Sequence, residues 1–168
     1  DLHGRCINEP MLDEPPGDRR ALGVADHAGG IAAMRDRIEI ISAERVRDEL
    51  TKLLLSDNPK PGLEALVDSG IAAIVLPELP ALRLELDEHH HHKDVYQHTL
   101  TVVAQAIDYE KDYGLTKDLV LRLAALLHDI GKPATRRLET GGAVSFHHHD
   151  VVGAKLAKKR LTALRFDN

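Results

Sequence analysis

The spacing of the aliphatic residues limits the fold of this chain more than any other feature of its sequence. Leu119, Leu123, Leu126 and Leu127 recur at intervals of three and four residues, the period of one face of an α-helix. Aromatic residues make up 3% of the chain and tryptophan is absent, so the core must consist mainly of Leu, Val, Ile and Ala. That mixture favours helices, and no pattern of parallel strands appears. The sequence therefore predicts an all-α fold.

Capping residues and helix breakers set the expected boundaries of the helices. Ser42 is placed to cap one helix and Thr116 another, while Gly114 and the Gly131-Lys132-Pro133 stretch are expected to end helices. A Gly141-Gly142 turn lies in a segment that is either a loop or a minimal hairpin. The predicted helices cover residues 31–39, 43–56, 62–69, 71–76, 94–113, 117–129 and 150–165.

The overall charge and the single cysteine exclude several classes of protein. The formal net charge is −5, so the chain as a whole carries no basic signal for nucleic acid, and any RNA contact must be local. Cys6 has no partner for an internal disulfide, which fits a reducing compartment and excludes a cysteine-based zinc site. No apolar stretch approaches the roughly 20 residues of a membrane span. We therefore expect a cytoplasmic protein without a membrane segment.

Histidine is over-represented, with 11 residues, and its positions indicate a metal site. The helices predicted on either side of Gly114 should pack antiparallel, because the connection between them is short. At about 1.5 Å per residue, His98 and His128 then each lie roughly 20 to 25 Å from that turn, at the same end of the pair. If the last helix runs back along the pair, it brings residues 147–149 to this end too.

Imidazole nitrogens together with a carboxylate suit a divalent transition metal, and Mg²⁺ or Mn²⁺ is favoured as oxygen ligands increase. Such a metal would activate water against a phosphate ester, and Lys132 is a candidate phosphate contact three residues after the Asp. The predicted ligands are His98, His128 and Asp129, with His147, His148 and His149 as additional candidates.

A second histidine run, His89–His92, is flanked by charged residues and is expected to be a solvated loop. Its nearness in sequence to His98 leaves open that one of its imidazoles borders the metal cluster.

The ligand pattern resembles the HD superfamily of metal-dependent phosphohydrolases, with His98 as the first histidine and His128-Asp129 as the paired ligands. This resemblance implies a divalent metal at these residues. The family pattern also has a final Asp on a later helix. Asp150 and Asp167 lie near the two ends of the last predicted helix and neither fills that role, so we expect the final Asp beyond Asn168.

Four stretches together resemble the neck, body and attached HD domain of bacterial CCA-adding tRNA nucleotidyltransferases, in the poly(A) polymerase-related family. They are RIEIISAERVRDELTKLL, DEHHHHKDVYQHTL, LAALLHDIGKPATRR and FHHHDVVGAK, and the resemblance covers residues 31–168. It implies that four residues brace a nucleotide-reading pocket: Arg37, Glu44, Arg45 and Glu49. From spacing alone, these residues are expected to form a solvated, charged face of the helix, with the ion pairs Glu44–Arg47, Arg45–Glu49 and Asp48–Lys52.

The resemblance implies a fragment of an enzyme that adds CCA to tRNA 3′ ends from ATP and CTP with Mg²⁺. We expect an irregular segment at residues 1–30, neck and body helices at 31–86 and a truncated HD-domain helical bundle at 87–168. The family's catalytic head carries a Gly-Gly phosphate-binding turn and an Asp-x-Asp pair, a combination that this chain lacks. No residue is therefore assigned to nucleotidyl transfer. The first residue, Asp1 rather than Met, also suggests a fragment.

Residues 1–30 depart from the family pattern, which has Glu-Asp-x-x-Arg before the neck. Glu14 and Arg20 match positions of this pattern, but Gly17 stands where the family has its nucleotide-reading Arg. The segment is therefore either divergent or misread through a frameshift upstream of Ile31.

Two other functions fit the residues. A stand-alone metal-dependent phosphohydrolase would use the HD site alone, and a non-catalytic helical module would only bind RNA. Basic residues near the HD pair and on the last helix are candidate phosphate contacts, and otherwise form an ordinary solvated face. These are Arg136, Arg137, Lys155, Lys158 and Lys159, with Arg160 and Arg165 beside them.

Overall fold

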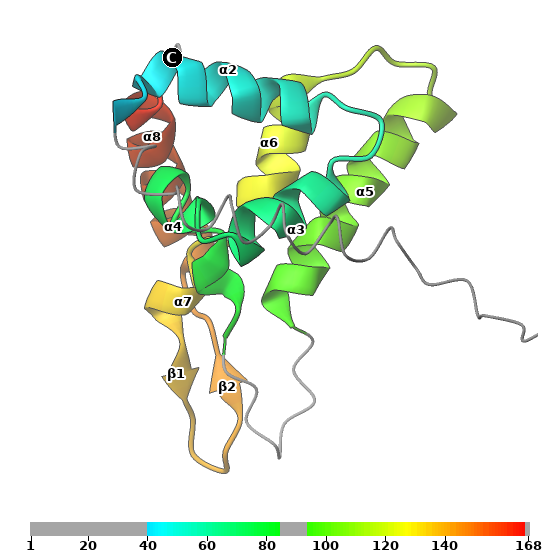
Figure 1. The fold of residues 1–168 in the computed structure, drawn as a ribbon. Helices are drawn as coiled ribbons and strands as arrows, with labels where there is room; N and C mark the ends of the chain where they lie inside the picture. The colour runs from blue at the N-terminus through cyan, green and yellow to red at the C-terminus, as the bar shows by residue number, and fades with distance from the viewer. Residues whose placement is uncertain (1–39, 85–93, 167–168) are drawn as a thin grey trace, which may run out of the picture.

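The computed structural model describes residues 40–84 and 94–166, and its regular secondary structure is helical apart from one small hairpin (Figure 1). This confirms the all-α prediction. Arg37, residues 1–30, His89–His92 and Asp167 lie outside the described residues. No helix in the two described ranges combines the length and the apolar character needed to cross a bilayer. The elements are α2 (Ala43–Leu54), α3 (Lys60–Asp68), α4 (Ala72–Val75), η2 (Pro80–Leu82), α5 (Val95–Asp112), α6 (Leu119–Leu127), α7 (Lys132–Thr135), β1 (Arg137–Leu138), β2 (Val144–Ser145) and α8 (His149–Ala163).

Helices α5 and α6 form the antiparallel pair that the short connection predicts (Figure 1). At one end of the pair, the backbone N–H of Asp118 donates to Oε1 of Glu110 over 3.0 Å. At the other end, the ring centroids of His98 and His128 lie 5.5 Å apart. Gly114 follows α5 with a φ of 63°, a left-handed conformation that glycine adopts without a steric penalty.

The N-cap of α6 is Asp118, and the prediction of Thr116 is wrong. The Asp118 carboxylate accepts hydrogen bonds from the backbone N–H groups of Val120 and Leu121. A capping oxygen must reach the second or third N–H of its helix, and the helix begins only at Leu119. The predicted cap of α2 is confirmed, because Ser42 Oγ accepts from the N–H of Arg45.

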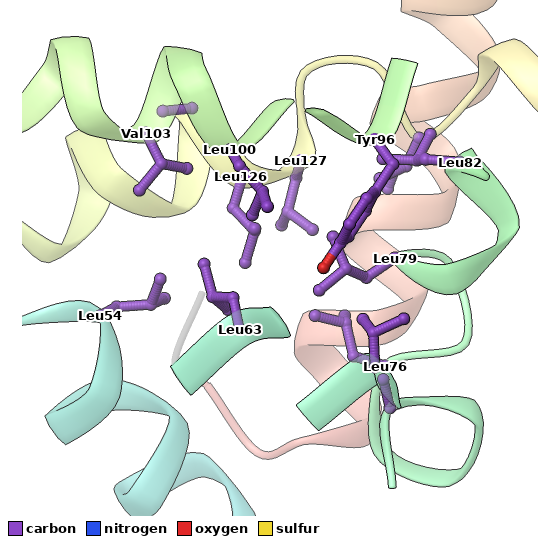
Figure 2. Close-up of a cluster of buried hydrophobic side chains, with 14 of the residues drawn as sticks. Leu54, Leu63, Leu76, Leu79, Leu82, Tyr96, Leu100, Val103, Leu126 and Leu127 are labelled. Atoms are coloured by element: carbon purple, nitrogen blue, oxygen red, sulfur yellow. The ribbon is translucent and has the colours of Figure 1, made fainter. Parts of the chain in front are cut away.

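The core is aliphatic and draws on both described ranges (Figure 2). Leu54 and Leu63 come from the first range and Leu100 from the second, and all three are 0% exposed. Tyr96 is the one aromatic side chain among the buried hydrophobic residues of the described ranges. Since apolar surface from both ranges is removed from water together, residues 40–84 and 94–166 fold around one shared core.

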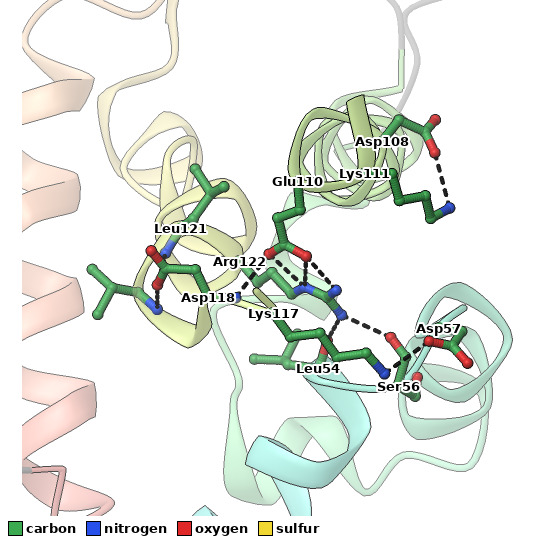
Figure 3. Close-up of polar contacts among 11 residues, drawn as sticks. Leu54, Ser56, Asp57, Asp108, Glu110, Lys111, Lys117, Asp118, Leu121 and Arg122 are labelled. Carbon is green, nitrogen blue, oxygen red and sulfur yellow. Dashed lines mark hydrogen bonds and ion pairs between the residues drawn. The ribbon is translucent and has the colours of Figure 1, made fainter. Parts of the chain in front are cut away.

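A buried ion pair adds a polar connection between the same two ranges (Figure 3). Arg122 on α6 pairs with Glu110 on α5, and their side chains are 2% and 3% exposed. The Arg122 guanidinium also donates from Nη1 to the carbonyl oxygens of Leu54, at 2.6 Å, and Ser56, at 2.7 Å. Arg122 therefore joins the end of α2 to the α5–α6 pair.

Helix α8 is connected to residues 40–84 at two points. The Arg160 guanidinium donates to both carboxylate oxygens of Glu78, with Nε 2.9 Å from Oε2. Near the end of the helix, Arg47 Nη1 donates to the carbonyl oxygen of Arg165 over 2.7 Å. Helix α8 is thus fixed both to the segment between α4 and η2 and to α2.

The segment between α6 and α8 differs in part from the prediction. Helix α6 ends before the Gly131-Lys132-Pro133 stretch, as predicted, but a second short helix, α7, begins there, with Pro133 in the first turn where its missing N–H costs nothing. The minimal hairpin is confirmed, with Arg137 opposite Ser145 and Leu138 opposite Val144. Gly141 and Gly142 form its turn, both at positive φ.

Candidate metal centre

Three of the predicted ligands lie together in the structure. His98 is in the first turn of α5, and His128 and Asp129 directly follow α6. One ligand atom from each of the three lies within 4.8 Å of the others. The antiparallel pairing of α5 and α6 therefore brings them together, as the residue arithmetic predicts.

The carboxylate of Asp129 is the centre of this cluster, and its side chain is 3% exposed. Its Oδ2 lies 3.1 Å from Nε2 of His128 and 4.0 Å from Nε2 of His98. Nε2 of His149 lies 3.7 Å from the other oxygen, Oδ1. Lys132 Nζ contacts Oδ2 over 2.6 Å. Three imidazoles and one ammonium group thus surround one buried carboxylate.

Two of the imidazoles are held in a defined orientation by backbone carbonyls. Nδ1 of His128 lies 2.8 Å from the carbonyl oxygen of Ala125, and Nδ1 of His149 lies 2.8 Å from that of Phe146. Because a carbonyl only accepts, Nδ1 is the donor in both bonds, which leaves Nε2 as the nitrogen that can ligate a metal. Metal-ligating histidines are commonly oriented by this type of second contact.

Two glycines allow the segment after α6 to approach the start of α8. A Cβ atom at Gly131 would lie 2.0 Å from the carbonyl oxygen of His149 and 2.6 Å from the nitrogen of Gly153. A Cβ at Gly153 would lie 3.3 Å from the nitrogen of Gly131. A side chain at Gly131 would therefore separate the two segments and move His149 away from Asp129.

The other two histidines of the run point elsewhere. Nε2 of His147 lies 4.0 Å from Oε1 of Glu139 in the hairpin region, and its side chain is 75% exposed. His148 is exposed and occupies the N-cap position of α8 with a φ of 62°. This left-handed residue turns the chain between His147 and His149, so that only His149 of the three approaches Asp129.

The donor set fits a divalent cation. Nε2 of His128 lies 3.1 Å from Oδ2 of Asp129, and Nε2 of His98 lies 4.0 Å from the same oxygen, so one cation beside Oδ2 is within reach of both imidazoles. Nitrogen and carboxylate oxygen donors together are the ligand type of Zn²⁺, Mn²⁺ and Fe²⁺ sites.

The basic candidates form two separate groups of exposed residues. Arg136 and Arg137 follow α7, close in sequence to the cluster. Lys155, Lys158 and Lys159 are exposed on α8, but Lys158 is nine residues after His149 and therefore lies about half a turn around the helix from it. Lys158 thus faces away from Asp129, while Lys155 and Lys159 are separated from His149 chiefly by distance along the helix, about 9 and 15 Å. Arg160 does not contribute to this face, because it is paired with Glu78.

Three of the four residues expected to brace a nucleotide pocket, Glu44, Arg45 and Glu49, lie on α2, and the ion pairs predicted there are replaced by others. Lys52 pairs with Glu49, and Arg47 pairs with Asp48. Glu44 lies 3.9 Å from Arg165 instead of pairing with Arg47, because the Arg47 side chain reaches the end of α8. Arg45 and Glu49 line a hollow of about 640 Å³ between α2 and the α3–α4 region.

Several residues that shape the centre are missed by reasoning from sequence. The carbonyls of Ala125 and Phe146 orient His128 and His149, and each lies three residues before its histidine. That spacing is a usable signal, because it places a histidine ring over a preceding carbonyl. Gly153 gives no signal of its own, since its partner Gly131 is distant in sequence.

Comparison with known protein families gives two matches, in consecutive parts of the chain. Residues 27–82 match the family described as the probable RNA and SrmB-binding site of polymerase A. Residues 95–167 match the HD domain family. The second match contains every residue of the Asp129 cluster.

Similar proteins of known function are tRNA nucleotidyltransferases. The chain is 40% identical over 130 residues to the A-adding tRNA nucleotidyltransferase of Deinococcus radiodurans, which covers 77% of this chain and 29% of that protein. It is 38% identical over 154 residues to the CC-adding tRNA nucleotidyltransferase of Thermus thermophilus, covering 90% and 33%. A third relative, the multifunctional CCA protein of Azoarcus sp., is 34% identical over 180 aligned positions, covering 95% and 40%.

The chain thus spans between 29% and 40% of the length of these relatives. Its matched segments occur in the order expected from the sequence, an RNA-binding segment followed by an HD domain. The chain thus joins a segment similar to the RNA-binding site of polymerase A to a segment similar to HD domains, and over most of its length it is similar to one part of tRNA nucleotidyltransferases.

Proposed function

We propose that this chain is the RNA-binding and HD portion of a tRNA nucleotidyltransferase that extends tRNA 3′ ends with ATP and CTP. The observation that carries the proposal is the order of the two family segments around one shared core. Relatives named for A addition, CC addition and multifunctional CCA activity support the reaction class. The nucleotidyl-transfer step itself is assigned to no residue of this chain.

Within that protein, the Asp129 cluster is proposed as a divalent-metal site for phosphate-ester hydrolysis. His98, His128 and Asp129 would hold the cation, and His149 is the best-placed additional ligand because its Nε2 faces Oδ1 of Asp129. A divalent cation supplies Lewis-acid activation of water and of a phosphoryl oxygen. The backbone bonds of Ala125 and Phe146 keep the two imidazoles in the ligating tautomer.

The basic residues and α2 are assigned separate parts in RNA and nucleotide binding. Arg136 and Arg137, which are exposed and close in sequence to Asp129, are proposed to contact phosphates near the metal site, and the exposed α8 lysines to contact the tRNA backbone further along the helix. Arg45 and Glu49 line the hollow beside α2, which supports a role for them in bracing a nucleotide-reading pocket. Glu44 and Arg37 complete the proposed set on the neck.

Metal binding tests the HD assignment directly. A titration with Mn²⁺, followed by the electron paramagnetic resonance signal of the free ion, should show one bound ion per chain. Asp129→Asn and His128→Ala should each weaken binding at least tenfold. His147→Ala is the matched control, because His147 is an exposed histidine that faces Glu139 rather than the cluster. Equal loss in all three variants would refute the ligand set.

The transferase assignment is tested with the full-length natural protein and a tRNA that lacks its terminal CCA. Incorporation of labelled CMP or AMP supports the proposal. Hydrolysis of phosphate esters without any nucleotide incorporation would instead support the stand-alone phosphohydrolase. Charge reversal of Lys155, Lys158 and Lys159 should weaken tRNA binding without changing Mn²⁺ binding, since these residues are exposed and lie about 9 to 15 Å along α8 from His149.

A further inference from the structure

Lys132 occupies a position at the metal centre that a simple phosphate contact does not require. Its Nζ lies 2.6 Å from Oδ2 of Asp129, the same oxygen that Nε2 of His128 approaches to 3.1 Å. A lysine whose only role is to contact a substrate phosphate could extend into solvent when no substrate is bound. Lys132 is instead directed inward, and its side chain is 21% exposed.

Two independent contacts hold the ammonium group in place. Lys132 lies three residues after Asp129, at the first position of α7, so its side chain reaches back over the turn between them. Its Nζ also lies 5.7 Å from the ring centroid of Phe146, a cation–π contact with the residue that orients His149. The ammonium thus compensates the buried charge of Asp129 when no metal is bound.

The geometry points to Lys132 as the resident counter-ion of Asp129, which a divalent metal must displace from Oδ2 in order to bind. Two cations that share one carboxylate oxygen repel each other, and the repulsion is strong where the carboxylate is shielded from water. The lysine therefore sets the metal affinity of the centre. This inference rests on the proposed metal site.

Displacement leaves the ammonium at the edge of the centre, beside the bound metal. There it becomes available to an anionic oxygen of a phosphate ester. Metal binding and phosphate binding are then linked, because the metal releases the group that contacts the phosphate.

Lys132→Met tests the inference, since methionine keeps an unbranched apolar side chain and removes the charge. We expect this variant to bind Mn²⁺ about ten- to a hundredfold more tightly than the unmodified chain. Lys132→Arg keeps the charge and serves as the matched control, with an affinity within about threefold of the unmodified chain. Equal or weaker Mn²⁺ binding by Lys132→Met overturns the inference.

Thermal unfolding gives a second readout that separates this role from a purely structural one. In EDTA, Lys132→Met should unfold at a lower temperature, because Asp129 loses its counter-ion. Addition of MnCl₂ should raise the unfolding temperature of Lys132→Met by more than that of the unmodified chain. If Lys132 has only a structural role, its replacement by Met should lower the unfolding temperature equally with and without Mn²⁺.

Asp129→Asn distinguishes failure of this inference from failure of the metal site. If Asp129→Asn abolishes Mn²⁺ binding while Lys132→Met leaves the affinity unchanged, the metal site is supported and the counter-ion role of Lys132 is refuted. If Asp129→Asn binds Mn²⁺ as well as the unmodified chain, both the metal site and the counter-ion role are refuted. Both are also refuted if neither the unmodified chain nor Lys132→Met binds Mn²⁺ at millimolar concentration.

Discussion

Two buried carboxylates, Glu110 and Asp129, lie toward opposite ends of the α5–α6 pair, and each side chain is 3% exposed. Glu110 is surrounded by donors, because both of its oxygens accept from Arg122 and one also accepts from the N–H of Asp118. Asp129 has one clear donor, Lys132, while its other neighbours include the imidazoles of His128 and His149, which are held at Nδ1 by backbone carbonyls. Burial alone therefore does not mark a functional carboxylate. The difference lies in whether its partners can only donate hydrogen bonds or can also ligate a metal.

The accessibility of the partners differs as well. Arg122 is 2% exposed and is bound to two backbone carbonyls in addition to Glu110. The partners of Asp129 include His98, at 44% exposed, and His149, at 36%. Glu110 is enclosed by the fold, whereas Asp129 lies at the base of an open group of ligands. The first arrangement favours stability and the second favours exchange with solutes.

The largest effect is expected from Arg122→Met. This change leaves Glu110 charged and buried and removes the donors of the Leu54 and Ser56 carbonyls, so it should lower the free energy of unfolding by about 3 to 5 kcal/mol. Urea unfolding at pH 7 measures it. Lys117→Met is the control, because the Lys117–Asp57 pair is exposed and is worth at most about 1 kcal/mol. A similar loss in both variants would contradict the comparison.

The two carboxylates should respond unequally to the same chemical change. Glu110→Gln leaves the Arg122 charge buried and unmatched, and should cost about 2 to 4 kcal/mol. Asp129→Asn should cost about 1 kcal/mol in EDTA, because Lys132 is able to turn toward water. The comparison fails if the Asp129 variant loses as much stability as the Glu110 variant. Urea unfolding of the two metal-free variants side by side decides it.

Acid should affect the protein through Glu110. The hydrogen bond from Arg122, with further contributions from the Asp118 N–H and nearby positive charge, lowers the pKa of Glu110 below its usual value near 4.5. A lowered pKa in the folded state adds stability that is present above pH 4.5 and is lost as the pH falls through the folded-state pKa. Unfolding free energies measured from pH 7 to pH 3 should show this loss. Glu110→Gln should remove the Glu110 contribution, and an unchanged acid profile would refute the assignment.

The smallest effect separates the two caps considered for α6. Asp118→Ala removes the acceptor for the N–H groups of Val120 and Leu121, and should cost about 1 kcal/mol. Thr116→Ala should change the stability by less than about 0.5 kcal/mol. Thermal unfolding of the two variants resolves this difference. A larger loss for Thr116→Ala would restore the cap expected from the sequence.

The sequence predicts the helices of this molecule well where apolar spacing determines them. Leu126 and Leu127 are buried as their period indicates, and the short link at Gly114 correctly predicts an antiparallel pair. Arg122 could not be predicted in the same way. It interrupts a leucine-rich helix and would be assigned to solvent by its charge, yet it is buried because its carbonyl partners lie 66 and 68 residues earlier.

The grouping of the candidate metal residues was predictable in part, for similar reasons. His98, His128 and Asp129 are brought together by helix geometry alone, which residue counting reproduces. The selection of His149 over His147 and His148 depends on the left-handed backbone at His148 and on the contact between Gly131 and Gly153. Both are features of tertiary packing, so the sequence leaves all three histidines as candidates.

The bonds of Arg122 have a consequence for how the chain folds. They cross from the segment matched to the RNA-binding family into the segment matched to the HD family, and the aliphatic core does the same. Neither segment retains a complete core without the other, so the described residues should unfold in a single cooperative transition. A chain cleaved between residues 84 and 94 should give two pieces that are unstable apart and regain helical structure when mixed.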